Sequence, residues 1–334
     1  MAQKDINPYI YSDSNKRYLT YDRYMKMRFG GKVAKVPLDI GCTCPNIDGS
    51  AGYGGCIYCK NGSSSAIGKT IDEQYQNGVN VMNRKWNNVG YIPYFQSNSN
   101  TYGSLAHLEK SYFEAAGLKN ALMVDIATRA DCISQEVLDI LERLSEKIPV
   151  TVELGLQTSN DKTADIINRC HSYEDFVKGY YLLDNLRNRI NADIHNDGEP
   201  YSFVKKRFTL CIHIINGLPG EMREDMLKTV SDAAKLNPDM IKIHMLHILK
   251  GTRIADLYLR NEFKLLDKEE YVSITCDQIE LLPPECVVAR VTGDGLEDDL
   301  IAPLWTRRKT QVANDIDKEL FRRNSYQGIN HNIT

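Results

Sequence analysis

The chain has 334 residues, of which 42% are hydrophobic, and a formal net charge of −3, so it is long enough for one large globular domain and shows no sign of disorder. Its longest apolar runs are too short to span a bilayer, and the start, residues 1–5, has no apolar stretch typical of a signal peptide. We therefore expect a cytoplasmic protein whose nine cysteines are reduced thiols and metal ligands rather than a disulfide framework.

Strand-length apolar runs alternate with helix-length amphipathic segments. The predicted strands are 36–40, 89–95, 121–128, 150–155, 208–214 and 240–246. The predicted helices are 71–86, 105–116, 134–147, 173–190, 221–236 and 268–281. Such alternation gives parallel strands joined by right-handed helical crossovers.

Six strand–helix units are too few to close an eight-stranded barrel, so we predict an α/β fold with an open, partial (β/α)6 TIM-like barrel. The expected boundaries are a barrel core over residues 31–283, a short extension over 1–30 and a C-terminal extension over 284–334 that packs on the barrel. Residues 191–206 are polar and are expected to form a surface insertion before the fifth strand.

A glycine-rich segment directly after the first predicted strand carries three cysteines, Cys44, Cys56 and Cys59. Thiolates are soft ligands that suit iron–sulfur clusters or zinc, and a pair two residues apart can serve either. A cubane held by three thiolates leaves one iron free to chelate a substrate or cofactor. The glycines permit φ > 0, which lets the backbone wrap closely around an inorganic core. The segment therefore indicates an iron–sulfur cradle.

Cys42 leaves a second interpretation open, because with the three other cysteines it would complete a four-thiolate zinc site by count. Two features favour the cluster. Tyr58, just before the last cysteine, offers an aromatic ring that can pack against a bound adenine, and the rest of the chain repeats strand and helix as a cofactor-binding barrel does.

Polar residues lie near the ends of the predicted strands, where barrels of this type gather their active sites. Glu153 on the fourth strand can accept hydrogen bonds from ribose hydroxyls, and the glycine turn after the fifth strand can offer backbone groups to an adenine. His244 can face a substrate pocket together with His213 and His247. The candidates from the second strand to the sixth are Gln96, Ser97, Asn98, Arg129, Glu153, Gln157, Gly217, Gly220 and His244.

Two basic clusters stand out against the net negative charge. They are residues 205–207 before the fifth strand and residues 307–309 after Trp305. Each cluster alone is most simply interpreted as a solvated surface. Together they are compatible with binding of an anionic partner.

These motifs resemble the radical S-adenosylmethionine enzymes, and within them the YhcC/YtqA branch, which is related to the radical domain of the Elongator catalytic subunit. The cysteine segment matches that branch's lengthened motif, in which eleven residues replace the usual three of the first gap. Further similar segments are 94–102, 153–158, 217–221 and 300–309, and the resemblance covers about residues 17–320. One departure is that residues 96–98 replace the glycine-rich stretch that usually follows the second strand.

The resemblance implies a [4Fe-4S] cluster on Cys44, Cys56 and Cys59, with Cys42 outside the ligand set. It implies that S-adenosylmethionine binds the open iron, and that an electron from a low-potential donor of flavodoxin or ferredoxin type releases a 5′-deoxyadenosyl radical. The implied cofactor-binding residues are Tyr58, Gln96, Ser97, Asn98, Arg129, Glu153, Gln157, Gly217, Gly220 and His244. No catalytic residue is assigned.

For the substrate, the resemblance suggests tRNA and conversion of the carboxymethylaminomethyl group of a wobble uridine to aminomethyl. Arg307, Arg308 and Lys309 would then meet phosphates, and Trp305 would stack on a base. Two alternatives stay open. A radical enzyme acting on a free small molecule or peptide needs no basic surface, and a non-enzymatic zinc or iron–sulfur scaffold needs no polar strand ends.

Overall fold

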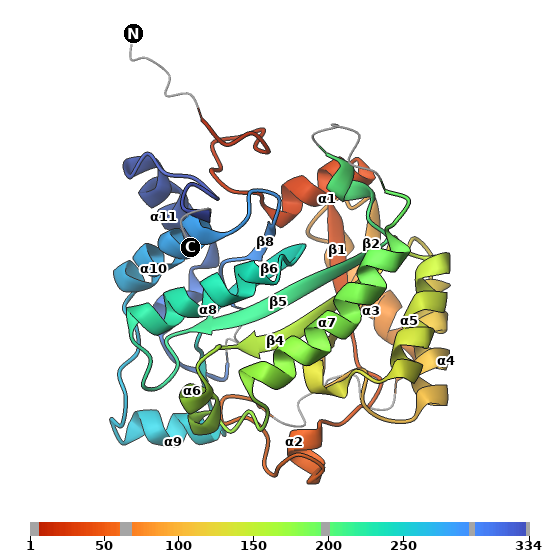
Figure 1. The fold of residues 1–334 in the computed structure, drawn as a ribbon, viewed down its shortest axis with the longest axis horizontal. Coiled ribbons are helices and arrows are strands. Elements are labelled where there is room, and N and C mark those ends of the chain that lie inside the picture. The colour runs from red at the N-terminus through yellow and green to blue at the C-terminus, as the bar shows by residue number, and fades with distance from the viewer. Residues whose placement is uncertain (1–6, 61–68, 195–200, 294–297, 332–334) are drawn as a thin grey trace.

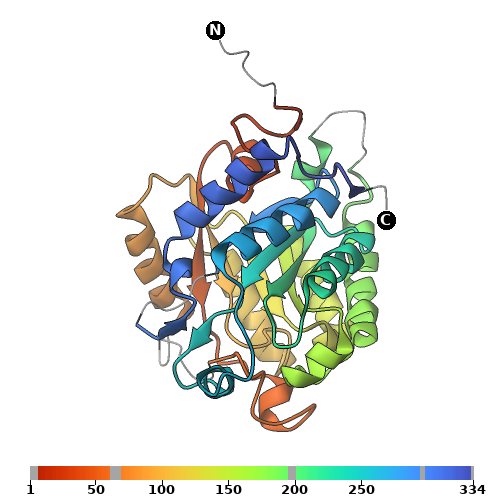
Figure 2. The same cartoon turned by 90° about the vertical axis from the view of Figure 1, so that its left-hand side faces the viewer.

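The computed structural model describes residues 7–60, 69–194, 201–293 and 298–331, so residues 1–5 and part of the expected insertion, 195–200, lie outside it. One parallel sheet of seven strands curls into part of a barrel, with helices over its outer face (Figures 1 and 2). The strands, in sheet order, are β1 (Val33–Leu38), β2 (Gly90–Phe95), β3 (Val124–Thr128), β4 (Val150–Gln157), β5 (Phe208–Asn216), β6 (Met240–Met245) and β8 (Val287–Arg290). The predicted α/β class and open TIM-like barrel are confirmed.

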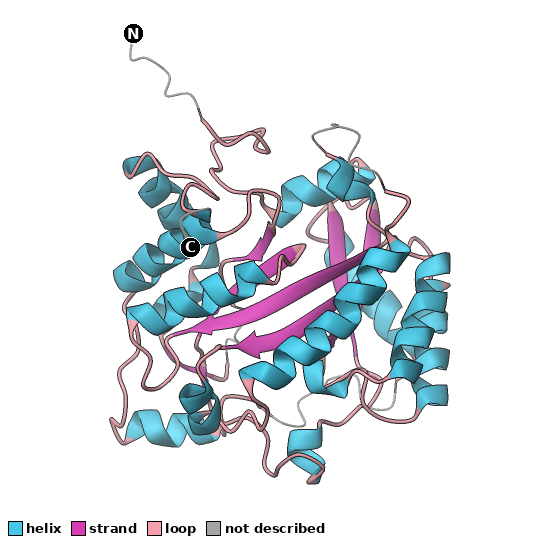
Figure 3. Cartoon of the chain, viewed as in Figure 1, coloured by secondary structure: helices cyan, strands magenta, loops and turns pink. Residues whose placement is uncertain are grey.

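Helices separate successive strands, as the alternation predicted (Figure 3). Ser134 caps α5 as expected, because its side chain accepts a 3.3 Å hydrogen bond from the backbone N–H of Val137. The helices are α1 (Tyr21–Phe29), α2 (Pro45–Asp48), α3 (Ile71–Asn83), α4 (Leu105–Ala116), α5 (Gln135–Lys147), α6 (Asp161–Ile166), α7 (Tyr173–Ile190), α8 (Arg223–Lys235), α9 (Arg253–Leu259), α10 (Lys268–Leu281) and α11 (Lys309–Arg322).

Three features of the strands differ from the sequence prediction. β1 begins at Val33 and not at residue 36, because Lys35 faces the barrel interior and interrupts the apolar run. β8 adds a seventh strand, four residues long, beyond residue 283, where the barrel core was expected to end. A small antiparallel pair, β7 (Ile248–Leu249) with β9 (Leu300–Ala302), lies outside the main sheet.

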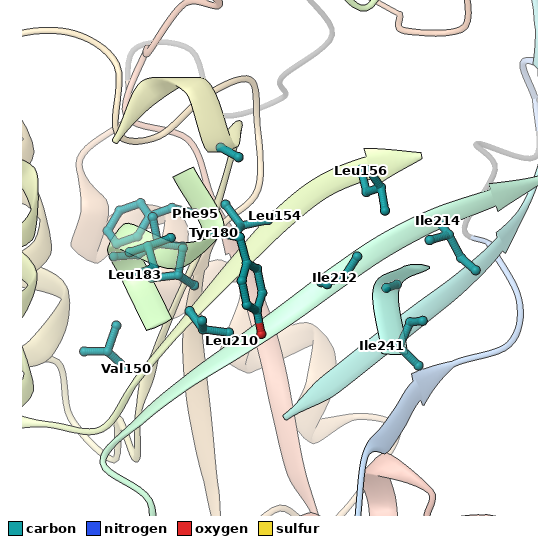
Figure 4. Close-up of a cluster of buried hydrophobic side chains, with 14 of the residues drawn as sticks. Phe95, Val150, Leu154, Leu156, Tyr180, Leu183, Leu210, Ile212, Ile214 and Ile241 are labelled. Atoms are coloured by element: carbon teal, nitrogen blue, oxygen red, sulfur yellow. The ribbon is translucent and has the colours of Figure 1, made fainter. Parts of the chain in front are cut away.

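The outer face of the sheet is apolar and packs against the helices. Figure 4 shows Leu154 of β4 and Leu210 and Ile212 of β5 next to Tyr180 and Leu183 of α7, and all five side chains are buried in one cluster. Burial of each such side chain stabilises the fold by about 1.5–3 kcal/mol. This face therefore carries most of the core.

The inner face is layered. At the amino ends of the strands it is apolar, and Tyr24 and Met25 of α1 close it against Val33, Met240 and Val287. A layer of charged side chains lies above this apolar cluster. A cavity opens above the charged layer, at the carboxyl ends of the strands. The sequence of a strand that is buried on both faces is normally a continuous run of apolar residues. The polar inner residues thus point to function rather than to packing.

Among the described residues, no helix combines the length and the apolar composition that crossing a membrane requires.

Candidate functional site

A cavity of about 740 Å³ occupies the carboxyl end of the barrel. Its volume lies within the range of roughly 300–1,000 Å³ that is usual for small-molecule sites. It brings together most of the residues that the sequence singled out. These are Cys44, Cys56, Cys59, Tyr58, Gln96, Ser97, Asn98, Arg129, Glu153, Gln157 and His244, with Cys42, His213 and His247.

Gly217 and Gly220 are not among the lining residues. Both have positive φ, 84° and 83°, and an added Cβ would meet Leu266 in the first case and Ile166 in the second. They shape a turn packed against neighbouring segments, and their role toward an adenine stays a prediction. Trp305 does not line the cavity either, and its ring packs 5.4 Å from that of Tyr271.

The cysteine loop is held in place by a hydrogen bond of its own and by two neighbouring segments. Inside the loop, the backbone N–H of Gly55 donates to the carbonyl of Asn46 at 2.8 Å. From the end of α6, Asn168 donates through its side chain to the carbonyl of Gly55, also at 2.8 Å. From the start of α9, the Arg253 guanidinium donates to the same carbonyl oxygen. These bonds position the loop at the cavity mouth, beside the first turn of α2, which begins directly after Cys44.

The four thiols near the cavity are not arranged as a tetrahedral zinc site in this structure. A zinc ion with four sulfur ligands at about 2.3 Å would need its sulfurs roughly 3.8 Å apart. Within the described residues, no three cysteine sulfurs lie within 4.8 Å of one another. Cys56 and Cys59 do lie close together: a hydrogen bond from Cys59 lowers the pKa of Cys56 to about 6. Cys42 is buried, and burial raises the pKa of its thiol to about 11.

The turn after β2 carries the polar side chains that replace the usual glycines. Gln96 and Asn98 are exposed and line the cavity. Asn98 has φ of 60° and donates through its amide to the carbonyl of Cys42 at 2.8 Å. The backbone N–H of Ser99 donates to the carbonyl of Thr43 at 3.2 Å. This turn is therefore tied to the cysteine loop.

Two neighbouring arginines line the cavity, one after strand β3 and one after helix α6. Arg129, after β3, pairs with Asp131 through two hydrogen bonds of 2.9 and 2.6 Å, and donates to the carbonyl of Arg169 at 2.8 Å. Arg169 is almost fully buried and donates to the carbonyls of Thr158 and His171. Burial and both arginines lower the pKa of His171 to about 3, so its imidazole is neutral at pH 7.

Glu153 lies at the centre of the charged layer below the cavity. Its Oε2 is 2.5 Å from Nζ of Lys242 and 3.0 Å from Nε2 of His213, and its Oε1 is 2.7 Å from Nζ of Lys35. Lys35 also pairs with Asp125. Burial alone would raise the pKa of Glu153, but the two ammonium groups hold it well below its usual range. The buried Lys242 and the partly buried Lys35 thus face two buried carboxylates, Glu153 and Asp125.

The histidines above this layer are neutral. Burial and Lys242 lower the pKa of His213 to about 4, and burial and the neighbouring cations lower that of His244 well below its usual range. The two rings are 5.5 Å apart. Nε2 of His244 is buried and makes no hydrogen bond. Glu153, Cys211 and His213 lie close enough together to hold a metal, but Lys242 and Lys35 already balance the carboxylate, so we assign no ion there.

No site role was predicted from the sequence for five further residues that line the cavity, Lys242, Tyr94, Arg169, His171 and Arg290. Lys242 and Tyr94 could have been found, because each is a polar residue at an inward position of an otherwise apolar strand. Arg169 and His171 gave no such signal, because the short helix α6 brings them back over the cavity.

Comparison with known proteins identifies the family. Residues 238–322 match the family described as the Radical_SAM C-terminal domain. The chain is 39% identical to YtqA of Bacillus subtilis over 326 residues, which cover 96% of this chain and 95% of YtqA. It is 31% identical to YhcC of Escherichia coli over 88% of this chain and 89% of YhcC. The chain therefore belongs to the radical S-adenosylmethionine superfamily, in the family of YtqA and YhcC.

More distant likenesses concern a part of longer proteins. The chain is 26% identical over 172 residues to the tRNA uridine(34) acetyltransferase of Methanocaldococcus jannaschii, which is 51% of this chain and 28% of that protein. The solved structure of Elp3 from Methanocaldococcus infernus has the same fold, with a TM-score of 0.64 and 17% identity. That match covers 88% of this chain and 64% of the Elp3 chain.

Proposed function

We propose that this protein is a radical S-adenosylmethionine enzyme that modifies a wobble uridine of tRNA, converting a carboxymethylaminomethyl group to aminomethyl. The observation that carries the enzymatic part is the cavity, which gathers three cysteines and the polar strand ends of a superfamily member in one place. The tRNA part is supported by the likeness of half of the chain to a tRNA uridine(34) acetyltransferase.

Cys44, Cys56 and Cys59 would hold a [4Fe-4S] cluster. Together with S-adenosylmethionine, such a cluster supplies a carbon-centred radical that removes a hydrogen atom from a substrate. The protein's part is to bind, orient and exclude water. Tyr58 lines the cavity beside these cysteines, so its ring can cover an adenine there.

The turn at residues 96–98 and the side chains of Arg129 and Gln157 line the same cavity and offer hydrogen-bonding groups to a polar cofactor. Glu153 reaches the cavity from below, and its oxygens already bind Lys35, Lys242 and His213. A ribose hydroxyl would thus meet an already paired carboxylate, and the role of Glu153 in ribose binding stays a prediction.

For the tRNA body we propose the basic segment that follows β9. The pairing of β9 with β7 brings this segment near the cavity, because Leu249 of β7 lines it. Arg307 and Arg308 are exposed, as phosphate contacts require. Trp305 packs against α10 and positions the segment, so its proposed stacking on a base has no support from the geometry.

The other basic residues fit this role less well. Lys206 pairs with Asp239 at 2.5 Å, and Arg207 pairs with Asp193 at 3.2 Å. Both lie before β5 and so at the amino end of the barrel, away from the cavity. The electron donor that we propose, a flavodoxin or ferredoxin, would approach the cluster from the mouth, where Cys59 is exposed.

Modified-nucleoside analysis of tRNA tests the proposal. Total tRNA from cells lacking this protein should accumulate 5-carboxymethylaminomethyluridine at the wobble position and lose the aminomethyl form, and wild-type protein should reverse this while the Cys56→Ala variant should not. Unchanged wobble nucleosides in the deletion strain would remove the tRNA assignment, and a small molecule that stimulates 5′-deoxyadenosine formation would then favour the small-molecule alternative.

A further inference from the structure

Two imidazoles from neighbouring strands lie next to each other on the inner face of the barrel. His213 of β5 and His244 of β6 both line the cavity, and their ring centres are 5.5 Å apart. In the parallel register, His213 is opposite Lys242 and His244 is opposite Ile215. His244 is therefore one inward position closer to the carboxyl ends of the strands than Lys242, which belongs to the charged layer.

The hydrogen bond between His213 and Glu153 fixes which nitrogen of His213 is left for a ligand. Nε2 of His213 is 3.0 Å from Oε2 of Glu153. Because an ionised carboxylate only accepts hydrogen bonds, Nε2 carries the proton and donates it. Burial and Lys242 lower the pKa of His213 to about 4, so the ring is neutral at pH 7 and Nδ1 keeps its lone pair. His213 thus offers a hydrogen-bond acceptor to the cavity.

His244 adds a nitrogen that has no partner. Its Nε2 is buried and makes no hydrogen bond within the described part of the chain. Burial and the neighbouring His213 lower the pKa of His244 well below its usual range, so this ring is neutral too. A neutral imidazole can carry its proton on Nε2 and donate it. Since buried polar groups in proteins are normally satisfied, an open one in a cavity wall indicates a contact with a bound molecule.

This pair of nitrogens suits a planar ring that carries a donor next to an acceptor. The lone pair on Nδ1 of His213 requires an N–H or O–H group from the ligand, and it disfavours an anion at the same place. A uracil presents N3–H beside the C4 carbonyl, and its C5 atom is next to C4. A protein that holds this edge of the base therefore fixes the direction of a substituent on C5.

We propose that His213 and His244 bind the N3–H and C4 carbonyl edge of a uracil in the substrate. Nδ1 of His213 accepts a hydrogen bond from N3–H, and Nε2 of His244 donates one to O4. The inference rests on the proposed function, in which the reacting group is attached to C5 of a uridine. The two histidines are then specificity-determining residues, because a base without this edge leaves their nitrogens unpaired.

The topology favours the substrate over the cofactor as the occupant. The cysteine loop follows β1, which is the first strand in the sheet order, whereas β5 and β6 are the fifth and sixth. Tyr58 lines the cavity beside the cysteines and is available to cover the adenine there. The adenine and the ribose of S-adenosylmethionine also carry neighbouring donors and acceptors, so the experiment has to separate the two sources.

A pair of small probes isolates the contact. 1-Methyluracil keeps the N3–H and C4 carbonyl edge, and 1,3-dimethyluracil has a methyl group in place of the N3 hydrogen. They are titrated calorimetrically into cluster-loaded protein that is saturated with S-adenosylmethionine and kept unreduced, so that the cofactor side is filled and no turnover occurs. Wild-type protein should bind 1-methyluracil about tenfold more tightly, as expected when a buried acceptor would otherwise stay unpaired.

The variants assign the two hydrogen bonds. His213→Leu should bring the ratio of the two affinities close to one. His244→Phe should weaken binding of 1-methyluracil by about fivefold, and His244→Gln should recover part of this loss because its amide still donates. The matched control is His107→Phe, since His107 is an exposed histidine on α4 outside the cavity, and it should keep the wild-type affinities.

Three outcomes would overturn the inference. One is a wild-type protein that does not bind 1-methyluracil or does not distinguish it from 1,3-dimethyluracil. Another is wild-type behaviour of both His213→Leu and His244→Phe in proteins with wild-type iron content. The third is a tenfold loss of affinity for S-adenosylmethionine in His244→Phe with the iron retained, which would assign the pair to the cofactor.

The probes also separate this inference from the tRNA assignment. If the deletion strain has normal wobble uridine and wild-type protein still prefers 1-methyluracil, only the tRNA assignment fails, and the substrate is another uracil derivative. If the deletion strain accumulates the unconverted nucleoside and the probes show no preference, only the role of the two histidines fails.

Discussion

Glu153 shows how one residue can control the electrostatics of the whole barrel interior. It is 1% exposed and lies between the ammonium groups of Lys35 and Lys242, at 2.7 and 2.5 Å. Removing one partner of a buried ion pair leaves a charge uncompensated, and this typically costs about 3–5 kcal/mol. The first effect of a change at this position is therefore on stability.

We predict that Glu153→Ala lowers the free energy of unfolding by about 3–5 kcal/mol, measured by urea denaturation. The double variant Glu153→Met/Lys242→Met should recover part of this loss, because it removes both charges of the close pair together. A loss below about 1 kcal/mol in the single variant would show that the lysines are solvated and the charged layer is not closed.

His213 makes stability depend on pH. Its pKa is lowered, by burial and by Lys242, from 6.5 to about 4 in the folded state. Between these values the unfolded chain binds the proton and the folded protein does not, so stability is highest above pH 6.5 and falls as the pH drops toward 4.

We expect His213→Gln to reduce this slope by about 1.4 kcal/mol per pH unit at most, which is the contribution of one proton. Urea midpoints of wild type and variant at pH 7.5, 6 and 5 measure it. Parallel curves for the two proteins would mean that the imidazole of His213 titrates normally in the folded state.

The cysteine loop shows how one element depends on its neighbours. α9 reaches it through Arg253, whose guanidinium donates to the carbonyl of Gly55, and through the backbone N–H of Ile254, which donates to the carbonyl of Ile57 at 3.0 Å. These contacts hold the segment just before and just after Cys56.

Arg253→Ala should loosen the loop and lower the iron retained after anaerobic reconstitution by about two- to fivefold, since one hydrogen bond to a charged group is worth about 1.5–3 kcal/mol before the loop relaxes. Arg260→Ala, directly after the last residue of the same helix, should leave iron content unchanged. Equal iron in both variants would show that α9 does not position the ligands.

The strands show which elements could be predicted from the sequence. The bounds of the long strands β4 and β5 were predicted to within two residues, because the outward-facing residues of both strands are all apolar. β1 was displaced because Lys35 belongs to the inner charged layer. β8 was not predicted because it has only four residues and comes shortly after two prolines. So short an apolar run cannot be distinguished from a turn by its pattern.

At the scale of the whole molecule, residues predicted for the site lie close together where chemistry and topology coincide. The cysteines and the polar strand ends meet because the carboxyl ends of parallel strands share one edge of the barrel. The ion pairs of Glu153 could not be predicted, because its partners Lys35 and Lys242 come from strands that are distant in sequence. Trp305 was predicted to have a surface role. Its contact with the ring of Tyr271 depends on where α10 packs, which the sequence does not show.

The basic segment gives a prediction about how the whole molecule meets tRNA. Changing Arg307, Arg308 and Lys309 together to alanine should weaken tRNA binding for all sequences. It should also reduce the slope of log Kd against log salt by about two to three, because each lost phosphate contact reduces the number of counterions that binding releases. Fluorescence titration at several salt concentrations measures it.

The control is the triple change of Arg143, Lys178 and Arg189 to alanine, since these exposed side chains form ion pairs on the outer faces of α5 and α7. It should leave the salt slope unchanged. An equal loss in both triple variants would mean that general charge, and not this segment, attracts the tRNA.

The central claim is that Cys44, Cys56 and Cys59 form a cluster site for radical chemistry with S-adenosylmethionine. The most direct test is to measure 5′-deoxyadenosine by liquid chromatography after anaerobic reconstitution with iron and sulfide, reduction with dithionite and addition of S-adenosylmethionine. The account predicts about four iron atoms per chain and formation of 5′-deoxyadenosine in the wild type, retained in Cys42→Ala and absent in Cys44→Ala, Cys56→Ala and Cys59→Ala. A protein that binds one zinc per chain, takes up no iron and forms no 5′-deoxyadenosine would contradict it.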